Sequence, residues 1–250
     1  MRPMSRSRTT GKIEANLAAV RRRIGEAAKR AGRDPAGIRL VAVTKGRSVD
    51  EIRAAYAAGL TVFGENRVEE GRDKIEQLAA LDGVTWHMIG HIQSRKARDV
   101  VGAFSLIHSV DRPKIAEKLD ALAGRAGIQQ PVLVECNVSG EESKGGWPMR
   151  IESGWETRLP AFERLISLEG LSVRGLMTMA PWTKDRTLLG EVFGRLKSLS
   201  HFLAERIPGP YWAELSMGMS DDFEVAIEQG ATMIRVGRAI FDNAGHDAWV

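Results

Sequence analysis

The chain has 250 residues, of which 43% are hydrophobic and 27% are charged, a composition typical of a globular protein. Its net charge is +4, and part of the excess lies in the first twelve residues, at Arg2, Arg6, Arg8 and Lys12. We interpret these as a basic tail, not a nucleic-acid site, because no nucleic-acid motif follows. The single Cys136 excludes an internal disulfide. No membrane span or secretory signal is evident, so we expect a cytoplasmic protein without a membrane partner.

An amphipathic first helix is predicted by Ile13, Leu17, Val20 and Ile24, which repeat at helical spacing, and it ends near Gly32. After it, apolar segments of strand length alternate with helical segments. The predicted strands are 38–44, 61–64, 85–89, 105–110, 131–138, 171–179, 212–217 and 233–236. The predicted helices between them are 49–58, 68–80, 94–101, 113–126, 155–167, 187–206 and 221–229.

Eight apolar strands that alternate with helices favour an α/β protein with a single closed (β/α)8 TIM barrel and an extra N-terminal helix. An open, doubly wound sheet is the alternative. Its dinucleotide-binding form loses support because no Gly-x-Gly-x-x-Gly follows the first strand. We expect a flexible basic tail over 1–11, the barrel over 12–244 and a C-terminal tail over 245–250.

Lys45 ends the first strand. Side chains alternate along a strand, so Val41, Val43 and Lys45 share one face. If the valines fill the barrel interior, Lys45 projects into its mouth and is partly desolvated, which would lower its pKa and suit Schiff-base chemistry. The alternative is a lysine that simply leaves the core for water.

The loops after the last two strands have the residues of a phosphate site. Ser216 and Ser220 offer hydroxyls around Gly218, and Gly237 ends the eighth strand. We expect Ser220 to cap the helix that starts at Asp221. Barrels often bind phosphate with the loops after strands seven and eight, although two ordinary turns would give the same pattern.

Arg235 lies two residues before Gly237 and, if it faces inward, needs a partner. A carboxylate such as Glu65 is one candidate, and a ligand ring nitrogen is the other. His87 and His91 are four residues apart, but a strand and Gly90 break the helical geometry of a metal pair, so we expect no metal. A lysine and a phosphate cradle at one opening suit a phosphorylated aldehyde, and pyridoxal 5′-phosphate (PLP) fits that description.

Several stretches together resemble the pyridoxal phosphate homeostasis protein family. They are VAVTKG, FGENRVEEGRDKI, WHMIGHIQSRK, HSVDR, NVSGEESKGG, RGLMTMAP, LSMGMSDDFEVAIEQG and RVGRAIF, in that order between residues 13 and 241. The resemblance implies one barrel similar to the N-terminal domain of alanine racemases. It also implies that Lys45 forms the internal aldimine with PLP.

The same resemblance implies further contacts with PLP. The implied contacts are Ser216, Ser220 and Gly237 with the phosphate, Arg235 with the pyridine nitrogen, and Asn66 and Met177 near the cofactor. Two residues depart from the family pattern. Arg67 replaces the usual aromatic residue after GEN, and Arg95 replaces an asparagine. Both could alter the rim of the site, but neither touches the lysine or the phosphate loops.

The expected function is a PLP carrier in intracellular PLP homeostasis, without turnover. A racemase-like enzyme is the alternative. Arginine at the ring nitrogen weakens the electron sink that carbanion chemistry needs, and neither Tyr56 nor Tyr211 falls at the carboxyl end of a predicted strand to act as a second base. A barrel for another phosphorylated metabolite is the third reading. Apo PLP enzymes are the expected transient recipients, the chain is expected to be a monomer, and Lys144 is the alternative lysine for the adduct.

Overall fold

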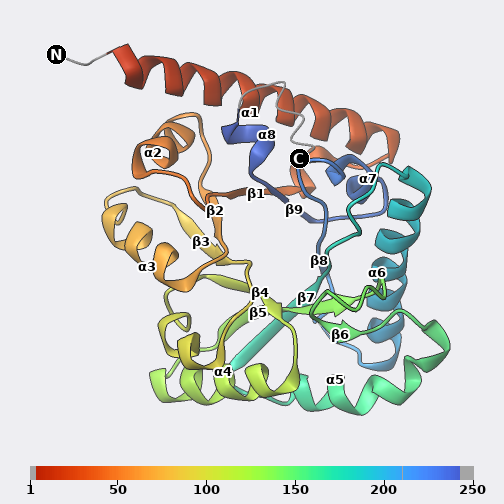
Figure 1. The fold of residues 1–250 in the computed structure, drawn as a ribbon. Helices are drawn as coiled ribbons and strands as arrows, with labels where there is room; N and C mark the ends of the chain where they lie inside the picture. Colours follow the sequence, from red (N-terminus) through yellow and green to blue (C-terminus); the bar gives the residue numbers. More distant parts are fainter. Residues whose placement is uncertain (1–3, 210, 243–250) are drawn as a thin grey trace.

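Eight parallel strands close into a barrel in the computed structural model, which describes residues 4–209 and 211–242 (Figure 1). Neighbouring strands follow the order β4-β3-β2-β1-β9-β8-β7-β5, and pairing of β4 with β5 closes the ring. The barrel strands are β1 (Arg39–Val43), β2 (Val62–Glu65), β3 (Thr85–Met88), β4 (Leu106–Val110), β5 (Gln130–Asn137), β7 (Leu171–Met177), β8 (Glu214–Ser216) and β9 (Met233–Val236). A two-residue strand, β6 (Trp147–Pro148), adds to β5 outside the ring. The predicted (β/α)8 barrel is therefore confirmed.

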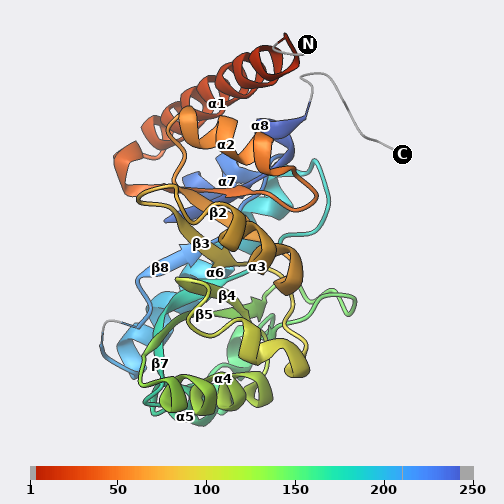
Figure 2. The same ribbon diagram turned by 90° about the vertical axis from the view of Figure 1, so that its left-hand side faces the viewer.

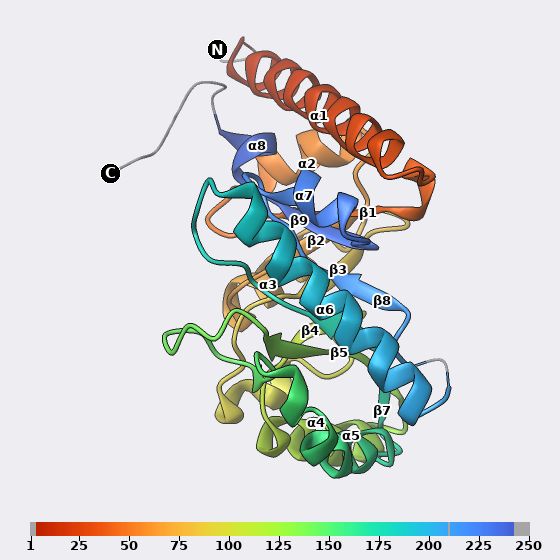
Figure 3. The ribbon, with the colours of Figure 1, turned by 90° about the vertical axis from the view of Figure 1, so that its right-hand side faces the viewer.

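Helices surround the barrel. They are α1 (Met4–Arg30), α2 (Val49–Ala57), α3 (Val68–Gln77), α4 (Pro113–Ala126), α5 (Leu159–Ile166), α6 (Arg186–Arg206), α7 (Phe223–Glu228) and α8 (Arg238–Phe241). Short 3-10 helices are η1 (Pro35–Gly37), η2 (Ser94–Asp99), η3 (Glu152–Gly154) and η4 (Glu156–Arg158). α6 packs against β7 and α7 (Figure 3). No helix in the described part of the chain is long and apolar enough to cross a membrane.

Local sequence signals set several helix ends. Ser48 and Glu51 form a reciprocal capping box at the start of α2. Pro113 begins α4, and Gly127 ends it with φ +65°. The predicted helix at 94–101 is wrong, because η2 occupies only Ser94–Asp99. It has no side-chain cap and buries only Ala97, so it lacks the apolar stripe that would stabilise a longer α-helix.

The predicted basic tail over residues 1–11 overlaps the first helix, because α1 begins at Met4. Contacts just after this stretch hold the helix to the C-terminal part of the barrel. The Lys12 ammonium donates to the Phe241 carbonyl at 2.9 Å, and the Asn16 amide donates to the Ile240 carbonyl at 3.0 Å. α1 lies on the outside of the barrel against α2, α7 and α8 (Figures 1 and 2). Residues 1–3 and the predicted C-terminal tail, 245–250, lie outside the described residues.

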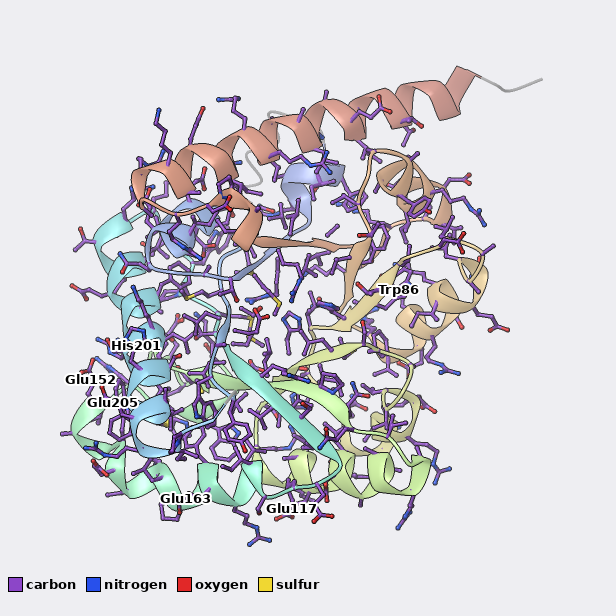
Figure 4. All side chains as sticks on the ribbon, turned by 180° about the vertical axis from the view of Figure 1, so that it is seen from behind. Trp86, Glu117, Glu152, Glu163, His201 and Glu205 are labelled. Carbon is purple, nitrogen blue, oxygen red and sulfur yellow. The ribbon has the colours of Figure 1, made fainter. Side chains whose placement is uncertain are left out.

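Apolar side chains fill the layer between strands and helices, and a smaller apolar cluster lies inside the barrel (Figure 4). The inner cluster consists of Leu106, Leu133, Met177 and Met233, one residue from each of four strands. By alternation, the residues two positions further along these strands also face inward. The loop between β5 and β6 projects from the end of the barrel where the strands finish (Figures 2 and 3). We call this carboxyl end the mouth.

Candidate functional site

Lys45 lies in a tight turn directly after β1. The Thr44 N–H still donates to the Gly64 carbonyl at 3.0 Å, and the Arg47 N–H donates back to the Thr44 carbonyl at 2.9 Å. Gly46 has φ +69°, a value that glycine adopts without strain in this kind of turn. The Lys45 side chain is exposed, so the expectation of partial desolvation is wrong. Among the residues that the structure describes, its ammonium has no hydrogen-bond or ion-pair partner.

Side chains from β2 and α3 hold this turn. The Thr44 hydroxyl donates to Glu65 Oε1 at 2.6 Å, and the Gly46 N–H donates to Glu70 Oε1 at 2.6 Å. The Lys74 ammonium donates to the Thr44 carbonyl at 2.6 Å and to both carboxylates at 2.7 Å. Glu65 is fully buried and Lys74 is 6% exposed. Desolvation raises the pKa of Glu65 despite its contacts with Lys74 and Thr44.

Arg235 lies inside the barrel, beneath the mouth. Its guanidinium donates to Ser216 Oγ at 2.7 Å and to the Thr178 carbonyl at 2.9 Å. Glu65 is therefore not its partner, because side-chain alternation puts Glu65 on the outer face of β2, beside α3. Burial lowers the pKa of Arg235 to about 10, which leaves it cationic at neutral pH. The structure thus provides a fixed positive charge at the floor of the mouth.

Two histidines continue this polar chain across the barrel. His108 Nδ1 lies 2.8 Å from Ser216 Oγ, and His108 Nε2 lies 3.0 Å from His87 Nδ1. Burial lowers the pKa of His87 to about 4 and that of His108 well below its ordinary value, so both rings are neutral at pH 7. The assignment that fits has Ser216 donating to His108 and His108 donating to His87. The fully buried Ser216 hydroxyl is therefore engaged within the barrel.

The loops after β8 and β9 meet beside the Lys45 turn. Ser220 Oγ accepts from the Ala239 N–H at 3.3 Å, and the Arg235 N–H donates to the Gly218 carbonyl at 2.9 Å. A Cβ on Gly237 would lie 3.1 Å from the Val43 carbonyl oxygen, so this loop packs on the end of β1.

The predicted cap at Ser220 is wrong. α7 begins at Phe223 with Asp222 at its N-cap position and has no side-chain cap bond. The Asp222 carboxylate instead accepts from the Met219 N–H, ahead of the helix. The Ser220 hydroxyl instead faces the first turn of α8, through the Ala239 N–H. Ser220 thus connects the loop after β8 to the segment after β9 and does not cap α7.

Glu135 is a residue of the mouth that sequence analysis missed. It shares the inward face of β5 with Leu133 and is 6% exposed. Within the described residues its carboxyl makes no hydrogen bond. Burial raises its pKa to about 7, and nearby Asp111 adds to the rise while Arg235 opposes it. An acidic residue within the apolar run PVLVECNV was the available signal.

The other predicted residues lie around this centre. Asn66 follows β2 and is half-buried, and a Cβ on Gly90 would lie 2.1 Å from its carbonyl oxygen. Met177 is 1% exposed and belongs to the inner cluster. The Lys144 ammonium donates to the Met179 carbonyl at 3.3 Å and pairs with Glu141.

Sequence analysis also named residues outside the expected PLP contacts, and the structure describes each of them. Arg67 and Arg95, the two departures from the family pattern, are both exposed. Burial raises the pKa of Cys136, which fits an inert thiol. His87 and His91 do not converge, because His91 Nδ1 instead lies 2.6 Å from Asp111 Oδ2. The described residues contain no group of three side chains that could hold a metal ion.

The family model for the alanine racemase N-terminal domain matches residues 15–243. A pyridoxal phosphate homeostasis protein of Pseudomonas aeruginosa is 42% identical over 230 residues, covering 92% of this chain and 94% of that protein. One of Aquifex aeolicus is 40% identical over 225 residues, covering 90% and 95%. The chain belongs to the pyridoxal phosphate homeostasis protein family.

Solved structures agree with this family. PipY of Synechococcus elongatus, solved with PLP bound, is 34% identical with a TM-score of 0.79, covering 92% of this chain and 99% of PipY. A protein of Bifidobacterium adolescentis has 34% identity and a TM-score of 0.86, covering 96% and 98%. An alanine racemase of Clostridium difficile, at 16% identity and TM-score 0.72, shares the fold. The match covers 95% of this chain but 58% of that racemase.

Proposed function

We propose that this member of the family binds PLP as a Schiff base on Lys45 and serves intracellular PLP homeostasis as a carrier without turnover. One observation carries the proposal: the exposed Lys45 turn, the loops at Ser220 and Gly237, and the Arg235 guanidinium all lie at one mouth. The PLP-bound PipY structure, at 34% identity, supports the same ligand. The proposal extends to a cytoplasmic monomer that passes PLP transiently to apoenzymes.

The residues at the mouth fit the three functional groups of PLP. Bound PLP supplies an electrophilic aldehyde carbon. The Lys45 ammonium releases a proton to water, its nitrogen forms a C=N bond with that carbon, and the aldehyde oxygen leaves as water. The Ser220 hydroxyl and the Arg238 N–H, which follows Gly237 at the start of α8, can donate to the phosphate, whereas the Ala239 and Ile240 N–H groups already have acceptors. Ser216 is better assigned to holding Arg235 than to the phosphate, because its hydroxyl already contacts Arg235 and His108.

The same geometry favours a carrier over a racemase. A cationic Arg235 donates hydrogen bonds and keeps a facing ring nitrogen unprotonated, which weakens the electron sink needed for carbanion chemistry. A second base is also needed opposite the lysine. The Tyr56 hydroxyl instead donates to the Asp82 carbonyl at 3.1 Å, and Tyr211 packs against Trp212. We therefore expect no amino-acid racemisation above that of free PLP.

Lys45→Ala is expected to abolish the covalent adduct. The wild-type protein with PLP should show a visible absorbance band that borohydride bleaches, with the added mass on Lys45 in peptide mapping. The variant should show neither, because among the residues that the structure describes no other exposed lysine ends a barrel strand beside the Gly237 loop. Lys144→Ala is the matched control and should keep the band.

Two results would contradict this assignment. A full band in Lys45→Ala with the mass on Lys144 would move the site to the β5–β6 loop. A wild-type protein without band or adduct would rule out both carrier and racemase, and would leave a barrel for another phosphorylated ligand.

A further inference from the structure

The turn that carries Lys45 is held by charged side chains that have no part in the proposed PLP contacts. We propose that Glu70 and Lys74 of α3, together with buried Glu65, are positioning residues that fix the backbone on both sides of Lys45. They thereby preset its amine for capture of the aldehyde. The inference deepens the proposed function and rests on it.

The contacts fall on the two peptide groups that flank Lys45. The Thr44 carbonyl, before it, accepts from Lys74 Nζ at 2.6 Å, and the Gly46 N–H, after it, donates to Glu70 Oε1 at 2.6 Å. Exposed turns commonly satisfy such groups with water. Here an ammonium and a carboxylate replace water, and hydrogen bonds to charged groups are roughly twice as strong as neutral ones.

The buried Lys74 ammonium needs a full set of acceptors. Lys74 is 6% exposed, and a buried ammonium is unfavourable unless it is fully paired. Three acceptors surround it, namely Glu65 Oε1, Glu70 Oε1 and the Thr44 carbonyl oxygen. Burial would raise the pKa of Glu70, but hydrogen bonds from Lys74 and the Gly46 N–H outweigh it and lower the pKa. Glu70 is therefore ionised at neutral pH and accepts both bonds as a carboxylate.

We call Glu65, Glu70 and Lys74 the clamp. Its contacts are with the residues next to Lys45 and not with the Lys45 amine. The Lys45 side chain is exposed and unpaired within the described residues, so only its own torsions remain to be ordered when the amine meets an aldehyde. Holding the main chain of a reacting residue reduces the entropy lost on reaction, and small displacements slow such reactions strongly. The clamp should consequently affect the covalent step more than cofactor binding.

The experiment compares Glu70→Ala, Glu70→Gln and the control Glu69→Ala. Glu69 is the neighbouring residue of α3, but it pairs with Lys96, away from the turn. Three quantities are measured: hydrogen exchange of the Gly46 amide without cofactor, the rate of band formation with PLP, and the affinity for pyridoxine 5′-phosphate. That last ligand has an alcohol in place of the aldehyde and cannot form the adduct.

Glu70→Ala should speed exchange at Gly46 and slow band formation about tenfold, with less than about a twofold change in pyridoxine 5′-phosphate affinity. Glu70→Gln keeps an oxygen acceptor for the Gly46 N–H and should restore most of the rate. Glu69→Ala should match wild type. If Glu70→Ala formed the band at the wild-type rate, the inference would be overturned and the proposed function would stand. The same would follow if the variant lost band formation and pyridoxine 5′-phosphate affinity to the same degree. A wild-type protein that forms no band would overturn both.

Discussion

Replacing Lys74 with methionine is expected to lower the free energy of unfolding by about 3–5 kcal/mol, because it leaves a buried charge without its partner. Glu65 is fully buried, and its Oε2 has no hydrogen-bond partner among the described residues. Without Lys74, Oε1 keeps only the Thr44 hydroxyl as donor. Methionine fills a similar volume, so the lost stability would come from the unpaired charge and not from a cavity. Urea unfolding at pH 7 measures the free energy of unfolding.

Two further variants separate this effect from a general sensitivity to lost ion pairs. Arg164→Met removes the partner of Glu117 on the outer surface, where the side chains are 73% and 47% exposed, and should cost less than about 1 kcal/mol. The labelled Glu117 lies on the outer side of α4 (Figure 4). Adding Glu65→Gln to Lys74→Met removes the stranded charge and should recover part of the stability. A Lys74→Met loss no larger than that of Arg164→Met would contradict the buried-pair account.

The sequence predicted the barrel because its signals are local and repeated. Each strand is a short apolar run followed by a helical pattern, and eight such units leave few other closed arrangements. The helix at 113–126 was predicted with the bounds of α4, because Pro113 and Gly127 mark its two ends. The 94–101 segment lacked such marks and forms only η2. Local chemistry therefore predicted elements well where caps and breakers were present.

The site was predicted less completely because its contacts join distant strands. The chain from Arg235 through Ser216 and His108 to His87 uses four strands, and no local pattern pairs those residues. Glu65 was one candidate partner for Arg235, because both lie near the carboxyl ends of predicted strands. Alternation within β2 already put it on the outer face with Phe63, where Lys74 reaches it. Side-chain alternation, applied to every strand end, would have placed Arg235 inside the barrel and Glu65 outside it.

Glu135→Gln is expected to be about 3 kcal/mol more stable than wild type at pH 7.5 and about equal to it at pH 4.5. The folded-state pKa of Glu135 is raised from 4.5 to about 7, so the folded protein holds this proton over a range where the unfolded chain has released it. Stability from this group is fully present below pH 4.5 and is lost as pH rises to about 7. A shift of about 2.5 units at 1.36 kcal/mol per unit gives the magnitude.

The measurement is urea unfolding of both proteins at several pH values, with Glu117→Gln as the exposed control. His87, whose pKa is lowered to about 4, changes stability in the opposite sense, since its contribution is lost as pH falls below about 6.5. Because wild type and variant share His87, its contribution cancels in their difference. A stability difference that does not change with pH would show that Glu135 titrates normally.

The position of this titration also tests which neighbours set it. Asp111 raises the pKa of Glu135 and Arg235 lowers it, so Asp111→Asn should move the inflection to lower pH. At neutral pH the ionised carboxylate makes the folded barrel less stable than a neutral amide would. An ionisable group that destabilises the fold while it lines a mouth is characteristic of a ligand site rather than of a packed core. If Asp111→Asn left the inflection in place, burial alone would account for the shift, and Glu135 would be no different from any other carboxyl enclosed by strands.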